Sequence, residues 1–94
     1  MTTPSESGPA GVYAAMSDTA LFAAMAEAAN RLTGELVHQA DLAGTDGRRE
    51  QLLARLRQVR DERRSVDAGD RDAQLDRIQQ WEAERHRLRA GDPA

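Results

Sequence analysis

Cysteine and lysine are both absent from this 94-residue chain, and bulky side chains are scarce. Without cysteine the chain can form no disulfide and offers no thiolate ligand, so its stability must come from packing or association. Aromatic residues make up 3% of the sequence, namely Tyr13, Phe22 and Trp81. A chain of this length buries a modest fraction of its surface. We therefore expect one small domain with a thin core.

A basic N-terminal segment and a long apolar run are missing as well. The first fifteen residues contain no Lys or Arg and no apolar stretch, which predicts that the chain has no signal peptide. The longest Ala-rich stretch is broken by Glu27, well short of the roughly 20 apolar residues of a membrane span. We expect a cytoplasmic protein with no membrane partner.

Charge of both signs is abundant but unevenly distributed. All 13 basic residues are arginine, and twelve of them follow Gly47. Up to Gly47, six acidic residues face Arg31 alone, a balance of -5; after it, twelve arginines face ten acidic residues, a balance of +2. A mixed surface lacks the single-sign patch that neutralises phosphates, so the sequence disfavours nucleic-acid binding.

Hydrophobic periodicity predicts three helices, at about 18–43, 48–65 and 71–90. Apolar residues recur at three- and four-residue steps in each. Turns are predicted at 44–47 and 67–70, where Gly, Asp and Thr gather and Gly69 suits a left-handed position after a helix. The apolar positions of the three helices are, in order, Leu21, Phe22, Met25, Ala29, Leu32, Leu36 and Ala43; Leu52, Leu56 and Val59; and Leu75, Ile78, Trp81 and Leu88.

The chain ends lack this periodicity. Pro, Gly and hydroxyl residues dominate the start, so we expect a disordered tail at 1–16, a single helical domain at 17–91 and a short tail at 92–94. Short connections place consecutive helices antiparallel. The predicted fold is all-α, an up-down-up arrangement whose second and third helices form a charged, coiled-coil-like C-terminal hairpin. That hairpin has too few apolar residues to fold alone, so the first helix or a second chain must cover it.

No pattern in the sequence indicates catalysis or a cofactor. A nucleophile with an ordered base, a Gly-rich phosphate loop and a paired-carboxylate cleft are all missing. We therefore expect no enzymatic activity and no cofactor. The preferred hypothesis is a small protein–protein interaction module or adaptor that forms a homodimer. Its predicted contact residues are Phe22, Met25, Leu32, Leu36, Leu52, Leu56, Val59, Leu75, Ile78 and Trp81.

A different hypothesis comes from the second turn. Its sequence, from Asp67 through Asp70 to Gln74, resembles the acidic tip of DksA-type transcription factors, in which a helical hairpin carries an Asp-x-x-Asp-x-Ala tip into RNA polymerase. Asp67 and Asp70 match the two tip carboxylates, but Asp72 stands in the place of the motif's Ala, and the four zinc-binding cysteines of that family are absent. The resemblance implies a transcription regulator that acts through this tip.

A third hypothesis is a metal-binding helical bundle. Glu35 and His38 form a Glu-x-x-His pair, which is half of what a di-iron carboxylate bundle takes from each of two helices. Glu82 and His86 lie one turn apart and could complete such a site in a dimer. His38 falls about 200° from Leu36 on the helix, facing away from the apolar stripe. The sequence therefore predicts no metal site, and these four residues are the only candidates.

Overall fold

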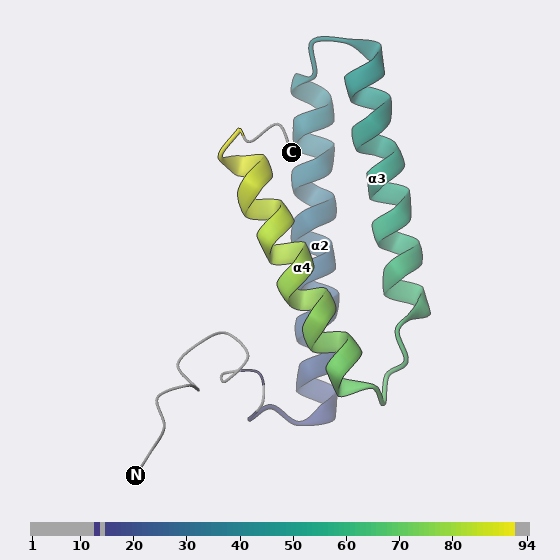
Figure 1. Ribbon diagram of the computed structural model, residues 1–94, viewed down its shortest axis with the longest axis vertical. Helices are drawn as coiled ribbons and strands as arrows, with labels where there is room; N and C mark the ends of the chain where they lie inside the picture. The colour runs from purple at the N-terminus through teal and green to yellow at the C-terminus, as the bar shows by residue number, and fades with distance from the viewer. Residues whose placement is uncertain (1–12, 14, 92–94) are drawn as a thin grey trace.

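The computed structural model describes residues 13 and 15–91, and the regular structure within them is entirely helical. Three helices follow one another: α2 at Asp18–Leu42, α3 at Asp46–Ser65 and α4 at Arg71–Arg89. They pack side by side (Figure 1), so the all-α prediction is confirmed. In this described part of the chain, no helix combines the length and apolar character that crossing a membrane requires.

Side-chain caps decide where the helices begin. Ser17 accepts a hydrogen bond from the backbone N–H of Ala20 at 3.1 Å, and Thr45 accepts one from that of Arg48 at 3.1 Å. Each satisfies a donor that has no partner inside the helix. Because Thr45 is the cap, α3 starts at Asp46, two residues before the predicted Arg48. At their C-terminal ends, α2 and α4 each stop one residue before the predicted 43 and 90.

The structure corrects the predicted role of Gly69. Among the described glycines only Gly91, just after α4, has a positive φ, at 77°. The chain leaves α3 through Val66 in an extended conformation, so the turn to α4 requires no left-handed residue at Gly69. Gly91 follows the cap residue Ala90, the position where the left-handed conformation commonly ends a helix.

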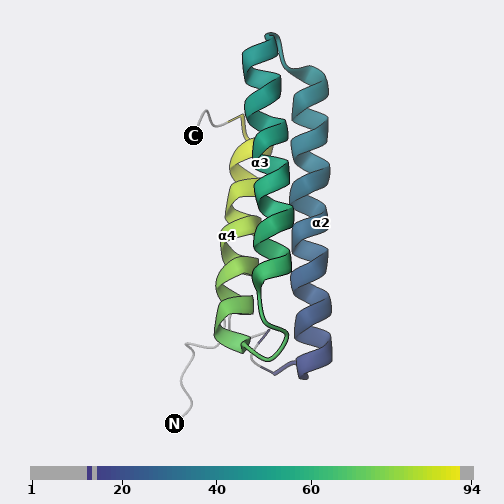
Figure 2. The same ribbon diagram turned by 90° about the vertical axis from the view of Figure 1, so that its right-hand side faces the viewer.

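The longest helix, α2, packs against both of the others. Its main chain lies close to those of α3 and α4, whereas α3 and α4 approach each other little. Figure 1 shows α4 inclined across α2, so that its C-terminal end lies away from α3, whereas in the view of Figure 2 the three helices run nearly parallel. The sequence predicted that these two helices form a hairpin, which the first helix or a second chain must cover. In the structure α2 provides apolar surface to both of them.

The core is small and lies along this central helix. Leu21, Met25, Leu32 and Leu36 of α2 are at most 1% exposed, and Trp81 of α4 is fully buried. Several alanines of α2 are also buried, which allows the neighbouring helices to approach closely. The remaining buried apolar residues are Ala28, Ala29, Ala40, Leu52, Leu56, Val59, Ile78 and Leu88.

The buried residue in the first turns of α4 is polar, although the sequence predicted its apolar neighbour to be in the core. Gln74 is fully buried, whereas Leu75, the predicted core residue, is only half-buried. The Gln74 Nε2 donates to the carbonyl oxygens of Asp67 at 3.0 Å and Ala68 at 2.7 Å. These bonds fix the turn before α4 to the start of that helix, which gives Gln74 a structural reason to point inward.

The predicted tails at 1–16 and 92–94 fall mostly outside the described residues. Tyr13 and Met16 are described, and both are half-buried against the core. The guanidinium of Arg71 donates to the carbonyl of Met16 at 2.9 Å and forms an ion pair with Asp18 at 2.6 Å. Met16, within the segment predicted to be a tail, is thus held against the start of α4.

Candidate interaction surfaces

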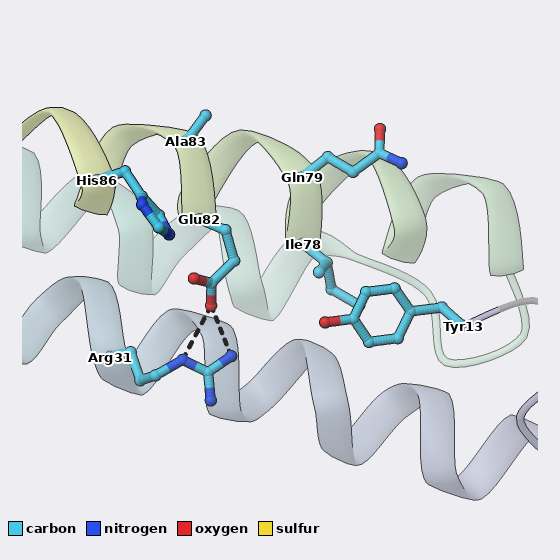
Figure 3. Close-up of a pocket in the computed structure, with 7 residues that line it drawn as sticks. All are labelled: Tyr13, Arg31, Ile78, Gln79, Glu82, Ala83 and His86. Atoms are coloured by element: carbon cyan, nitrogen blue, oxygen red, sulfur yellow. Dashed lines mark hydrogen bonds and ion pairs between the residues drawn. The ribbon is translucent and has the colours of Figure 1, made fainter. Parts of the chain in front are cut away.

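An open groove runs between α2 and α4. Its volume is about 480 Å³. Figure 3 shows Glu82 and His86 pointing from α4 toward α2, the ring of Tyr13 beside Ile78, and Ala83 and Gln79 pointing away from α2. Apolar atoms make up most of this lining, and the ion pair of Arg31 with Glu82 crosses the groove. The lining residues are Tyr13, Arg31, Ile78, Gln79, Glu82, Ala83 and His86.

An ion pair across this groove joins the two helices. Arg31 of α2 donates from Nε and Nη2 to one carboxylate oxygen of Glu82, the first of these bonds being 2.9 Å long. Its Nη1 also donates to Glu27 at 3.1 Å. The hydrogen bond from Glu82 raises the pKa of Arg31 above its ordinary value, against the opposing effect of desolvation. The groove thus carries fixed charges of both signs.

A second surface lies between α2 and α3, and we call it the α2–α3 face. It consists of Phe22, Ala26, Asn30, Thr33 and Val37 of α2 with Arg57, Arg60, Arg63 and Arg64 of α3. Phe22 is 39% exposed and Val37 is 44% exposed, although both are large and apolar. The side chains of Asn30 and Thr33 line a depression of about 230 Å³ together with Arg60 and Arg63.

A network of charged side chains bridges α3 and α4. Arg55 donates to Glu84 of α4 at 2.9 Å and to Glu62 at 2.8 Å. The indole N–H of Trp81 donates to the second oxygen of Glu62 at 3.1 Å, and Arg77 forms an ion pair with that same oxygen at 3.3 Å. Charged side chains therefore join α3 and α4, whose main chains approach each other little.

This network shifts the pKa values of its members. The pKa of Arg55 lies above its ordinary value because of its hydrogen bonds to Glu84 and Glu62, which outweigh desolvation. Burial alone would raise the pKa of Glu62, but hydrogen bonds from Arg55 and Trp81 reverse that effect and hold the pKa below 4.5. Both side chains are thus charged at neutral pH, and each neutralises the other.

Most of the predicted contact residues lie inside the molecule. Met25, Leu32, Leu36, Leu52, Leu56, Val59, Ile78 and Trp81 are all at most 6% exposed. Their apolar surface is already covered by the chain's own helices, so a single folded copy does not present it to a partner. Of the predicted set, Phe22 is exposed and Leu75 is half-buried.

The two carboxylates of the predicted hairpin tip hold the turn itself. Asp70 caps α4 by accepting from the N–H of Ala73 at 3.0 Å, and Asp67 accepts from the N–H of Gly69 at 3.2 Å. Both residues are exposed. Capping and turn formation account for these side chains with no partner required.

The four candidate metal ligands do not gather at one point. Glu35 accepts a hydrogen bond from Gln39 at 2.9 Å, and Glu82 is engaged by Arg31. His38 and His86 are both exposed. Within residues 13 and 15–91, no cluster of three or more His, Cys, Asp or Glu side chains has the geometry to hold a metal ion.

Two interactions that position these surfaces went unrecognised in the sequence. The Arg31–Glu82 pair joins residues 51 positions apart, which periodicity within one helix cannot reveal. The Arg55–Glu62 pair is separated by seven residues, or two turns, and that spacing is a detectable signal. A buried indole also needs a hydrogen-bond acceptor, which points to a nearby carboxylate or amide.

Comparisons of the chain with protein-family models, with curated proteins and with solved structures found no match.

Proposed function

We propose that this protein is a non-catalytic helical interaction module, or adaptor, that self-associates through the groove between α2 and α4. The observation that supports this proposal is the open groove of about 480 Å³, which the described side chains leave unfilled. Exposed concave surfaces with apolar walls and polar edges are typical of binding sites.

The charges of this groove suit a second copy of the chain. In a twofold dimer each copy contributes the same patch, so a patch of one charge sign repels itself. Here Arg31 and Glu82 carry opposite signs, and Glu27 at the edge is 68% exposed. Two copies can therefore place unlike charges opposite each other while apolar atoms of the two grooves meet.

The same proposal includes the finer architecture. The connections at 43–45 and 66–70 are short and lie at opposite ends of the bundle (Figure 1), which favours helices that run up, down and up. The helix pairs that would pack like a coiled coil are α2 with α3 and α2 with α4, because α3 and α4 approach each other little.

Light scattering after size-exclusion chromatography tests self-association. Over a hundredfold range of concentration, the mass of the natural protein should rise from monomer to dimer, and its melting temperature should rise with it. Ala83→Arg places a long charged side chain at an exposed position of the groove and should keep the protein monomeric. Ala23→Arg, at an exposed position of α2 outside the groove, is the matched control. A mass that stays monomeric at every concentration would refute self-association.

A further inference from the structure

An uncharged stripe of α2 forms half of the α2–α3 face. Phe22, Ala26, Thr33 and Val37 follow one another at steps that keep them on one side of the helix, with Asn30 beside them. Phe22 and Val37, at the two ends, expose large apolar side chains to solvent. An extended partner that lies along α2 would cover both of them.

The other half of this face, on α3, is rich in arginine. At 3.6 residues per turn, Arg57, Arg60, Arg63 and Arg64 fall within a sector of about 120°. All four are exposed. Among the described residues only Arg64 of this group forms an ion pair, with the exposed Asp61 at 2.5 Å. Arg63 also donates to the amide oxygen of Asn30 at 3.4 Å, and this acceptor is neutral. The charges of Arg60 and Arg63 therefore remain available to a partner.

Two depressions along this face define the shape of an occupant. One, lined by Asp18, Thr19, Phe22 and Ala68, has a volume of about 230 Å³, and so does the one around Asn30 and Thr33. The carboxylate of Asp18 is paired with Arg71 at 2.6 Å. The centres of the two depressions are separated by about 11 residues of α2, or roughly 16 Å at 1.5 Å per residue. A partner helix can place apolar side chains at the same spacing by repeating them at three- and four-residue steps.

From this arrangement we propose that the α2–α3 face binds an acidic amphipathic helix of another protein. The apolar side of that helix covers Phe22 and Val37, and its carboxylates pair with Arg60 and Arg63. The bound helix would be the fourth helix of a bundle. This inference rests on the adaptor role proposed above but not on self-association, which uses a different groove.

The charges of the α2–α3 face make a second copy of the chain or a nucleic acid a less suitable partner. A twofold axis perpendicular to the helices places α3 of one copy opposite α3 of the other, where Arg60 and Arg63 meet like charges. An axis parallel to the helices places these arginines opposite the uncharged stripe of the partner's α2, where they find no carboxylate. A nucleic acid would use the arginines but not the uncharged half of the face on α2, and the acidic Glu50 and Asp61 border the arginine sector. An acidic amphipathic helix satisfies both halves.

The test uses a fluorescein-labelled synthetic helix of 20 residues. It carries leucine at positions i, i+4, i+7 and i+11 with glutamate on both sides of this stripe, and its binding to the full chain is followed by fluorescence anisotropy. A second peptide has lysine in place of every glutamate. The glutamate peptide should bind saturably and more weakly as salt rises, and the lysine peptide should bind at least about tenfold more weakly.

Paired variants locate the binding surface. Val37→Ser and the double variant Arg60→Ala with Arg63→Ala should each weaken binding of the glutamate peptide by about tenfold or more. The controls are Leu42→Ser, which removes an exposed apolar side chain elsewhere on α2, and Arg87→Ala with Arg89→Ala on α4. These controls should bind like the natural protein, and circular dichroism shows that each variant folds.

Three results would overturn the inference: equal binding of the two peptides, equal effects of face and control variants, or tighter binding of a 20-nucleotide single strand of DNA, which would make the face a polyanion site. Failure here is distinguishable from failure of self-association. Ala83→Arg should bind the peptide normally, and Val37→Ser should self-associate normally. If the mass still rises with concentration while no peptide binds, only the present inference falls.

Discussion

Removing the carboxylate of Glu62 should destabilise the fold more than its place at the edge of the core suggests. Glu62 is the one acceptor for the indole N–H of the fully buried Trp81 among the described residues. It also accepts from Arg55 and lies 3.3 Å from the guanidinium of Arg77. The side chain is 24% exposed, so water screens these interactions only in part.

The expected cost follows from what each substitution leaves behind. Glu62→Gln keeps an oxygen that can accept from Trp81 and loses the charge, which should cost about 1 kcal/mol. Glu62→Leu also leaves the indole N–H buried with no acceptor, which adds about 1–3 kcal/mol. We therefore expect losses of roughly 1 kcal/mol for Glu62→Gln and roughly 2–4 kcal/mol for Glu62→Leu in the free energy of unfolding.

Urea denaturation followed by the fluorescence of the single tryptophan measures both values. Asp61→Asn is the matched control, because Asp61 and its partner Arg64 are 72% and 73% exposed, and such pairs contribute little. Its effect should stay within about 0.5 kcal/mol. If Glu62→Leu cost no more than this control, or no more than Glu62→Gln, the assigned role of the carboxylate would be wrong.

The pH dependence of the same variants checks the charge. The pKa of Glu62 is lower in the folded state than its ordinary value of 4.5. The ionised carboxylate therefore stabilises the fold above that value, and this contribution is lost as the pH falls through the lowered pKa. The difference in stability between the natural protein and Glu62→Gln should accordingly be constant near neutral pH and shrink below about pH 4.5.

Two further substitutions test the turn before α4 and the end of that helix. Gln74→Glu replaces the amide that donates to Asp67 and Ala68 by a buried carboxylate. The free energy of unfolding at pH 7 should therefore fall by more than about 2 kcal/mol and partly recover in acid, where the carboxyl is protonated. The control Gln80→Glu, at an exposed position, should change the free energy of unfolding little. Gly91→Ala places a residue with a side chain in a left-handed backbone conformation, which should lower the free energy of unfolding, measured by heat or urea, by about 1 kcal/mol. The control Gly69→Ala should be close to neutral. Equal effects at the two glycines would contradict the assignment of Gly91 as the helix-ending residue.

The number and type of the helices could be predicted because they depend on local chemistry. Apolar residues at three- and four-residue steps define each helix, and Ser17, Thr45 and Asp70 supply the side-chain oxygens that the first turns require. These signals lie within a few residues of one another. The same locality explains why the predicted ends are within two residues of those observed.

The candidate surfaces could not be predicted in the same way. Periodicity identifies the apolar side of a helix but not whether the chain's own helices cover it. Leu32, Ile78 and Trp81 have the pattern expected of a contact surface and are nonetheless core, whereas Phe22 has the same pattern and is exposed. The difference depends on how α3 and α4 are placed around α2.

The sequence by itself determined that the chain forms three capped, charge-rich helices with few bulky residues, since propensity, capping and periodicity act over short distances. Only the tertiary structure decided that α2 packs against both other helices, that Glu82 pairs with Arg31, and that Glu62 accepts a hydrogen bond from Trp81 of another helix. These contacts join residues far apart in the chain. Their formation depends on the geometry of helix packing, which no local pattern of residues specifies.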